Sequence, residues 1–579
     1  MPYASGARFE WEKECLPGTR ESLIADICNL LNDPSEDVPR VCLLTGVAGS
    51  GKSAVAHSIA RLYDDQGRLG SSYCFSRSDA ASRHPRNLFS TIARDLSDHD
   101  PQYKSALWGV VKDDRALRTS QSPMEQAEKL IIRLRKGLNP IGPLVIVIDA
   151  VDESGDRAGR RPLLRAIVEK IAKNIHATNL RFLITTRPED DILTALSPNP
   201  QIKLMQLSEI PPNVVDRDIE KLIYHSLHQY PELEYSWPNQ EWCRLLVRHS
   251  QHLFQWASTA CSFIEGEGTV GLNPRKRFRK LLQSANTDGG HSLDNLYRTI
   301  LIQLFTSDDT QEFFRTVMAI VLAIKEPLSV TSLSALFGEE LDVLAIIKPM
   351  GSLLDGVLDE EKPIRPLHTS FRDFLLDETR SSIFHVHILP QHSLHLGQAL
   401  LRCMQKMLRF NICDIKDSRV RNPAIPDLPS RVTKAIPPHL AYSCQYWMHH
   451  LQDTYTPDLL NEVTLFFKAF LPFWLEAISL LSLSSPLSPI LSALETCTIL
   501  TKWAKVNSMM IVRNEVLRKL LLGPRACHPC IRDLPIHPSF FPCPQRIHFP
   551  PLPICHAPDP IQLSPSSTLA MSPPQGCLC

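Results

Sequence analysis

The segment that most restricts the fold runs from Gly46 to Ser53, GVAGSGKS, and matches the phosphate-loop pattern G-x-x-x-x-G-K-[ST]. An apolar run, 41–45, precedes it and predicts a buried strand, and a helical pattern, 54–62, follows it. Glycines let successive backbone N–H groups turn inward around an anion, and the start of the next helix adds partial positive charge. The alternative is a glycine turn that binds nothing.

Two side chains of this segment have expected roles. Lys52 reaches the outer phosphates, and the Ser53 hydroxyl ligates Mg²⁺. The residues expected to contact the nucleotide phosphates are Gly46, Gly49, Ser50, Gly51, Lys52, Ser53 and Ala54.

Acidic residues follow a second apolar run, 144–149, which ends at Asp149. A carboxylate there lies at the carboxyl edge of the sheet, beside the phosphate loop, where α/β proteins bind ligands. Asp149 therefore suits the magnesium site, and Glu153 or Asp152 suits positioning of an attacking water. The alternative is a strand followed by a solvated acidic loop.

A third apolar run, 181–186, ends before Arg187. A bidentate guanidinium there can distinguish a triphosphate from a diphosphate. The alternative is a surface ion pair of Arg187 with Glu189 or Asp190.

Apolar runs and helical patterns alternate between about residues 40 and 209, and the runs are continuous rather than alternating with polar residues. Such strands are buried on both faces, which predicts a parallel sheet between helices, an α/β P-loop NTPase core. Mainly α-helical domains follow. One of them has two short helices and a turn-bearing stretch that suits a hairpin, an order typical of a winged-helix unit.

A chain of 579 residues predicts three to five domains. The expected segments are a lead-in helix and linker, 1–38; the NTPase core, 39–210; a helical domain, 211–323; a winged-helix-like domain, 324–391; a C-terminal helical domain, 392–510; and a disordered tail rich in proline and cysteine, 511–579.

Sixty-two basic and 62 acidic side chains leave no net charge, so we expect neither nucleic acid nor membrane as a partner. The most apolar stretch, 477–494, contains six serines and two prolines, which suits a core helix better than a membrane span. We find no signal peptide and expect a cytoplasmic protein.

Together, the phosphate loop, the acid strand ending in DAVDE and the TTRP strand resemble the NACHT class of signal-transduction (STAND) ATPases, known from fungal incompatibility proteins and animal innate-immune receptors. The segment from Cys15 to Glu21 is similar to the one that precedes the core in fungal members, often labelled nephrocystin-3-like. The resemblance covers about residues 10 to 505.

The resemblance implies a role for each matching residue. Lys52 and Ser53 would bind phosphate and Mg²⁺, and Asp149 would hold the metal. Glu153 and Asp152 would act on the hydrolytic water, with Arg187 as the phosphate sensor.

Two further assignments rest on the resemblance alone. Thr19 and Arg20 would line the base pocket. His368 would close over the diphosphate in the resting state, the alternative being a histidine satisfied within the core. After the sensor strand there is no clear Gly-x-Pro element, only Ile210-Pro211-Pro212, so ATP/ADP and GTP/GDP both stay open.

The function expected from the resemblance is a nucleotide-driven switch. ADP holds it closed, ATP with Mg²⁺ releases it for self-association or protein partners, and slow hydrolysis acts as a timer. Two alternatives stay open: a non-catalytic nucleotide-binding adaptor, and a small-molecule or nucleotide kinase that shares the phosphate loop.

Overall fold

The computed structural model describes most of the chain up to residue 481, in these ranges: 3–4, 6–35, 37–77, 84–114, 116–118, 120–134, 142–175, 178–228, 240–266, 273–285, 292–357, 359–416, 422–451 and 456–481. The expected tail, 511–579, and residues 482–510 of the predicted C-terminal helical domain lie outside these ranges.

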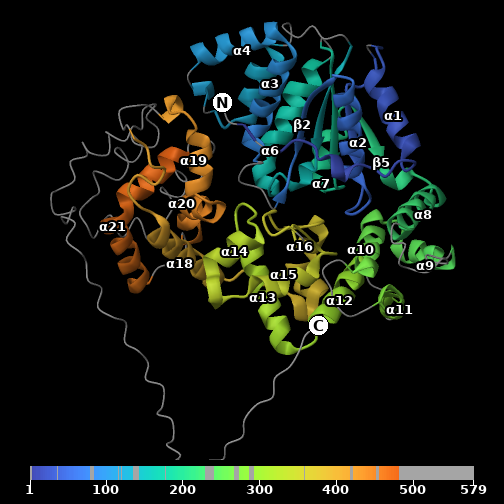
Figure 1. Ribbon diagram of the computed structural model, residues 1–579. Coiled ribbons are helices and arrows are strands. Elements are labelled where there is room, and N and C mark those ends of the chain that lie inside the picture. The colour runs from blue at the N-terminus through green and yellow to red at the C-terminus, as the bar shows by residue number, and fades with distance from the viewer. Residues whose placement is uncertain are drawn as a thin grey trace, which may run out of the picture. The chain divides into compact units, whose positions relative to one another are not determined.

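A five-stranded parallel sheet forms the core of the N-terminal half (Figure 1). Its strands lie in the order β2-β3-β4-β1-β5. Their bounds are Val41–Thr45 (β1), Leu69–Cys74 (β2), Leu144–Asp149 (β3), Leu180–Thr186 (β4) and Ile202–Gln206 (β5). The predicted parallel sheet between helices is therefore confirmed.

Helices cover both faces of the sheet. Alternate side chains of each strand point to opposite faces, so each strand contributes to the hydrophobic clusters on both. From β1, Val41 and Leu43 enter one hydrophobic cluster, and Cys42 and Leu44 enter another on the other face. The helices of this half are α1 (Glu21–Asn32), α2 (Lys52–Asp65), α3 (Leu88–His99), α4 (Pro101–Asp113), α5 (Pro123–Gln126), α6 (Arg157–Ala166) and α7 (Asp190–Leu196). Helices α1 and α2 cover the second face, and α3 to α7 cover the first.

The edge strand β5 is absent from the apolar runs that indicate strands in the sequence. Its side chains alternate irregularly between buried and exposed, with Lys203 and Gln206 exposed. Only Ile202 of its five side chains is buried, and a strand whose faces are only partly covered needs no continuous apolar run, so the sequence carried little signal for it.

The lead-in is attached to the sheet rather than separate from it. The Cys74 amide donates to the Ala7 carbonyl at 2.7 Å, and the Phe9 amide donates to Ser72 Oγ at 3.1 Å. Residues 7–10 thus run along the outer edge of β2 and reach α2.

Helices make up almost all of the remaining described residues, and their buried side chains form one continuous cluster. Their bounds are α8 (Pro212–His228), α9 (Gln240–Ser250), α10 (Phe254–Glu265), α11 (Pro274–Ala285), α12 (Ser292–Leu304), α13 (Asp308–Ala323), α14 (Val330–Phe337), α15 (Val343–Ile347), α16 (Thr369–Leu375), α17 (Glu378–Ser381), α18 (Pro390–Met407), α19 (Leu428–Ala435), α20 (Pro438–His450) and α21 (Pro457–Leu481).

The predicted hairpin of the 324–391 segment is present. Two short antiparallel strands, β6 (Leu354–Asp355) and β7 (Arg365–Pro366), follow α14 and α15 and precede α16. This order agrees with a winged-helix unit, and the assignment of a separate domain of that type stays a prediction.

Helix α21 is long and apolar enough, on length and composition alone, to cross a membrane, and half of its apolar stretch is buried. Within it, the Trp474 indole donates to the Cys444 carbonyl of α20 at 2.9 Å, and Glu476 accepts the Asn411 amide at 3.1 Å. These contacts are those of a core helix. Most of the stretch that the sequence singled out, 477–494, lies outside the described residues.

Candidate functional site

The phosphate loop joins β1 to α2 in a conformation that requires glycine. Gly49 and Gly51 have φ of 77° and 92°, a left-handed region that other residues rarely adopt. A Cβ on Gly46 would lie 2.8 Å from Ser50 Oγ, and one on Gly49 would lie 2.8 Å from Gln255 Cβ. Backbone conformation and close packing both account for the glycines.

Lys52 is the first residue of α2, and its ammonium lies inside the loop, donating to the Val47 carbonyl at 2.9 Å. Burial lowers the pKa of this lysine, while the carboxylates of Asp152 and Asp149 oppose the shift. A cation is thus held where a polyphosphate would lie.

The first turn of α2 supplies the other predicted phosphate contacts. Ser53 is exposed and Ala54 is half-buried, while the Ser50 hydroxyl is turned back to the Val47 carbonyl at 2.8 Å. The first amides of a helix have no intrahelical partner, so the start of α2 suits an anion.

Asp149 ends β3 and is 3% exposed. Its Oδ1 accepts a hydrogen bond from the Thr185 hydroxyl of β4, and the same hydroxyl oxygen accepts the Ala150 amide at 3.0 Å. Ala150 has φ of 57°, a strained value for a residue with a side chain. The strained turn ends the strand and begins the 3-10 turn Val151–Glu153 that carries the next two acids.

Both carboxylate oxygens of the buried Asp152 are engaged by one residue. The Arg187 amide donates to Oδ1 at 2.9 Å, and Arg187 Nε lies 3.1 Å from Oδ2. In this conformation Asp152 anchors Arg187, and its predicted action on a water stays a prediction.

Glu153 is the acid with the stronger case for proton transfer. Its Oε2 accepts the Arg77 amide at 3.1 Å. Burial, and next the charge of Asp152, raise its pKa from an ordinary 4.5 to about 7. A carboxyl group with a pKa near the operating pH is suited to act as a general base.

Arg187 lies at the end of β4 and reaches across to α16. Its Nη1 is 2.8 Å from Asp373 Oδ2, and its Nη2 donates to the Thr369 hydroxyl at 2.7 Å. The alternative surface pairing with Glu189 or Asp190 is not what is seen: Glu189 pairs with Arg160.

Asp373 and Arg77 were not identified from the sequence. Asp373 Oδ1 lies 3.1 Å from Arg77 Nη1, so the carboxylate is shared between Arg77 and Arg187. Arg77 follows β2 and Asp373 lies on α16, and no motif links positions so far apart. Only folding brings them together.

His368 caps α16 and lies near the phosphate loop. Its Nδ1 accepts the Ser370 amide at 3.2 Å, so the neutral ring carries its proton on Nε2. Burial, and next the charges of Arg187 and Lys52, lower its pKa to about 3, which keeps the ring neutral. The structure thus places this predicted residue within the field of the two predicted phosphate-binding cations.

Thr19 and Arg20 lie beside the loop. Thr19 donates to the Leu16 carbonyl at 2.7 Å. Arg20 Nη2 donates to the Ser50 carbonyl at 3.0 Å, and its guanidinium lies 4.7 Å from the centre of the Phe254 ring. Arg20 is 5% exposed, and its Nε and Nη1 have no hydrogen-bond partner among the described residues.

The start of α10 completes this side of the site and was also missed. The Gln255 amide donates to the Gly49 carbonyl at 3.1 Å, and Phe254 lies under Gly51. The two residues before Leu253, Gln251 and His252, both have positive φ. Neither is a glycine, so the sequence carried no sign of this turn.

These residues fit a magnesium-bound polyphosphate. The loop glycines, Lys52 and the start of α2 would bind the phosphates, and Arg20 beside the loop keeps two buried donors without partners among the described residues. Ser53 and Asp149 supply the hard oxygen ligands that Mg²⁺ prefers.

Residues 18–187 match the family described as "Nephrocystin 3, N-terminal". The matched segment starts one residue before Thr19 and ends at Arg187, so it contains the loop and the acids but neither α10 nor α16. No curated protein matches the chain.

Among solved structures, the chain is similar to a chain of Drosophila ORC bound to poly(dA/dT) DNA and Cdc6, with 11% identity and a TM-score of 0.20. The match covers 86% of this chain and 88% of that one. At that TM-score the likeness carries no argument about this chain.

Proposed function

We propose that this protein is a nucleotide-dependent switch of the NACHT type. It binds ATP or GTP with Mg²⁺ at the phosphate loop and couples the nucleotide to the position of α16. The observation that carries the proposal is the sharing of Asp373 between Arg77 and Arg187, since Arg187 is also the group suited to contact a terminal phosphate.

The coupling follows from charge. A terminal phosphate next to Arg187 would compete with Asp373 for the same guanidinium and would repel the Asp373 carboxylate. A diphosphate lacks that group and leaves the Arg187–Asp373 pair in place. The triphosphate therefore favours release of α16, and the diphosphate favours the closed form.

His368 would add a second difference between the two forms. Its Nδ1 is occupied by the Ser370 amide, and the charges of Arg187 and Lys52 act on the ring, so its Nε2–H would be the group that donates to a diphosphate while α16 is held against the sheet. Converting a 1:99 population to 99:1 takes about 5.5 kcal/mol of differential binding, so several such contacts are needed.

Magnesium, when bound, would neutralise the outer phosphates. The chain's own residues would do the rest: Ser53 and Asp149 hold the ion, Lys52 binds phosphate, and Glu153 accepts a proton from the attacking water. Hydrolysis by this arrangement would be slow and would return the switch to its closed form.

Titration calorimetry with ATP, ADP, GTP and GDP, with and without Mg²⁺, tests the proposal. We expect micromolar or tighter binding of one purine pair, and a change of oligomeric state with the triphosphate only. If none of the four nucleotides binds, the proposal is wrong.

A second candidate, a non-catalytic nucleotide-binding adaptor, is favoured by one observation. Protein groups already engage these acids in this conformation: Arg187 contacts both oxygens of Asp152, and Glu153 Oε2 accepts the Arg77 amide. Glu153→Gln separates the candidates: the switch predicts loss of hydrolysis and prolonged assembly with ATP, and the adaptor predicts no change in either.

A further inference from the structure

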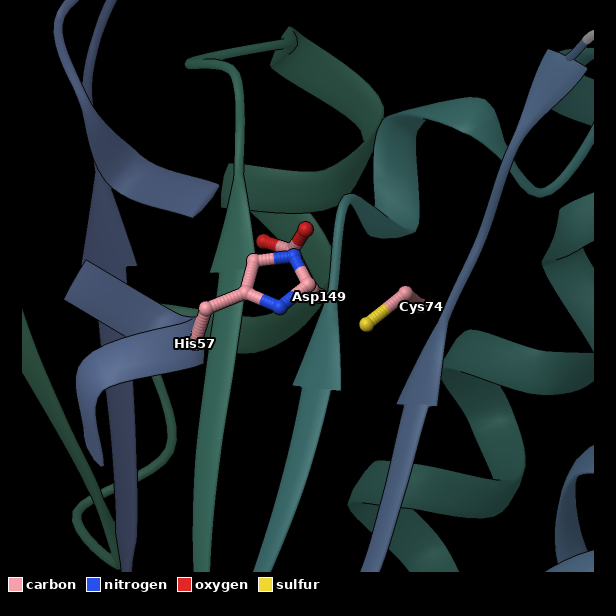
Figure 2. Close-up of side chains that lie close together, drawn as sticks. All are labelled: His57, Cys74 and Asp149. Carbon is pink, nitrogen blue, oxygen red and sulfur yellow. The ribbon is translucent and has the colours of Figure 1, made fainter. Parts of the chain in front are cut away.

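Three buried side chains with metal-ligand chemistry lie together between α2 and the ends of β2 and β3 (Figure 2). They are His57 of α2, Cys74 of β2 and Asp149 of β3. Their donor atoms all lie within 4.8 Å of one another, and each residue is at most 6% exposed. Figure 2 shows the His57 ring and the Asp149 carboxylate facing one another, with Cys74 Sγ pointing toward both.

The local sequence explains the grouping. His57 follows Ser53 by four residues, so both lie on the same face of α2. Cys74 and Asp149 are paired in register at the ends of β2 and β3. His57 lies next to Asp149 across the interface between α2 and the sheet. It is thus one helical turn beyond Ser53, the predicted magnesium ligand.

The hydrogen bonds of the cluster define the His57 tautomer. The Glu10 amide donates to His57 Nδ1 at 2.8 Å, so that nitrogen is an acceptor. A neutral imidazole with Nδ1 as acceptor carries its proton on Nε2. Because Figure 2 shows the ring facing Asp149, a donor is directed at the carboxylate whose other side is held by Thr185.

The same tautomer argues against a transition-metal site. A metal bound at Nε2 would need the Nε2 lone pair, which moves the proton to Nδ1. That proton would point at the Glu10 N–H, placing two donors against each other in a buried location. The hydrogen-bonded cluster is the arrangement with complementary partners.

We propose that His57 is a positioning residue for Asp149, holding its carboxylate in the orientation that receives the magnesium of a bound nucleotide. The proposal rests on the proposed function. The Thr185 hydroxyl fixes one carboxylate oxygen, and a ring nitrogen of His57 lies within 4.8 Å of the carboxylate. From there the Nε2–H would act on the carboxylate directly after a small rotation, or through one water. Mutating a residue that orients a metal ligand typically lowers the metal affinity about 10- to 100-fold.

Two substitutions of His57 separate its proposed action on Asp149 from its hydrogen bond with the Glu10 amide. His57→Asn keeps an acceptor near Nδ1 for the Glu10 amide and loses the donor toward Asp149. His57→Gln extends an amide donor to the position of Nε2. His450→Asn is the matched control, because His450 is a histidine of similar burial in α20.

The measurement is the ATP dissociation constant by calorimetry in Mg²⁺ and in EDTA, on the full chain. The ratio of the two constants is the magnesium gain. We expect His57→Asn to lower the gain about tenfold, His57→Gln to stay within about threefold of the wild type, and His450→Asn to leave it unchanged. Thermal melts without ligand report whether each variant folds.

Several results would overturn the inference while leaving nucleotide binding intact: an unchanged gain in His57→Asn, an equal loss in His57→Gln, or ATP binding by the wild type without any gain. Tight binding of Zn²⁺ alone to the wild type, lost in His57→Asn, would assign the cluster to a metal instead. If the wild type binds no ATP, the proposed function fails first and this inference fails with it.

Discussion

The carboxylate of Asp373 lies 2.8 Å from the guanidinium of Arg187, although 186 positions separate the two residues in the chain. Arg187 directly follows β4 in the half that contains the parallel sheet, and Asp373 lies on α16 of the helical half. The Asp373 side chain is 21% exposed, so solvent screens the pair only in part. This pair is the most direct electrostatic link between the predicted phosphate sensor and the helices that follow.

Asp373→Asn is predicted to favour the open form. The substitution keeps the shape of the side chain but removes the charge that Arg77 and Arg187 share. We expect ADP release to accelerate about tenfold, equivalent to about 1.4 kcal/mol of lost coupling, and self-association to occur without ATP. Stopped-flow release of a fluorescent ADP analogue and light scattering on a size-exclusion column measure the two effects.

The control for that variant is Asp377→Asn. Asp377 caps α17, and asparagine can still accept the amides of Thr379 and Arg380. Equal ADP release rates in Asp373→Asn and the wild type would show that the pair is not part of the switch.

Lys52→Ala is predicted to abolish nucleotide stabilisation. Saturating nucleotide at about 1,000 times its dissociation constant should stabilise the wild-type fold by about 4.1 kcal/mol. The variant loses the ammonium held inside the loop, so its melting temperature should not respond to ATP. Lys104→Ala, on the exposed face of α4, should respond like the wild type, and a shift of equal size in Lys52→Ala would contradict the site.

Arg20→Ala is predicted to weaken binding of the nucleoside rather than of the phosphates. Arg20 contacts Ser50 and Phe254 and keeps two buried N–H donors without partners among the described residues. We expect ATP affinity to fall about tenfold while inorganic triphosphate binds within about twofold of the wild type.

Arg40→Ala is the matched control for Arg20→Ala. Arg40 is equally buried but directly precedes β1, at the end of the strand opposite to the phosphate loop. A parallel loss of ATP and inorganic triphosphate binding in Arg20→Ala would place Arg20 on the phosphates and not on the base.

Glu153→Gln is predicted to stabilise the nucleotide-free protein in a pH-dependent way. The folded-state pKa of Glu153 is raised from 4.5 to about 7, so folding favours its neutral form. This group therefore costs stability progressively as pH rises from about 4.5 to about 7, and the full cost remains above pH 7. Glutamine carries no such cost.

The expected result is a melting temperature equal to the wild type near pH 5 and about 4 °C higher near pH 8, corresponding to about 2 kcal/mol. Circular dichroism melts at both pH values measure it. A difference that is the same at pH 5 and pH 8 would mean that the carboxyl group is not perturbed.

Much of the core was predictable because its signals are local. The runs at 41–45, 144–149 and 181–186 became β1, β3 and β4 with bounds within one residue of those expected. Continuous apolar strands must be buried on both faces, whichever helices cover them. The edge strand β5 was missed because its faces are only partly covered, which leaves most of its side chains free to be polar.

The residues of the candidate site likewise divide into those that local sequence patterns predicted and those that they did not. The positions of the loop and Lys52 were predictable because the motif places a strand end next to a helix start, and that of Asp149 because it ends a continuous apolar run. Phe254, Gln255 and Asp373 were not found, since each reaches the loop or its sensor from a helix whose location depends on the packing of the whole helical half.

The amino-acid sequence alone determined the chemistry of the phosphate loop, because glycines at 49 and 51 and a lysine at 52 impose their conformation and charge on any fold that contains them. Tertiary structure alone decided what those groups face. Asp373 against Arg187, His57 against Asp149 and α10 against Gly49 are long-range contacts, and such contacts follow from burying the apolar faces of helices, which no local pattern encodes.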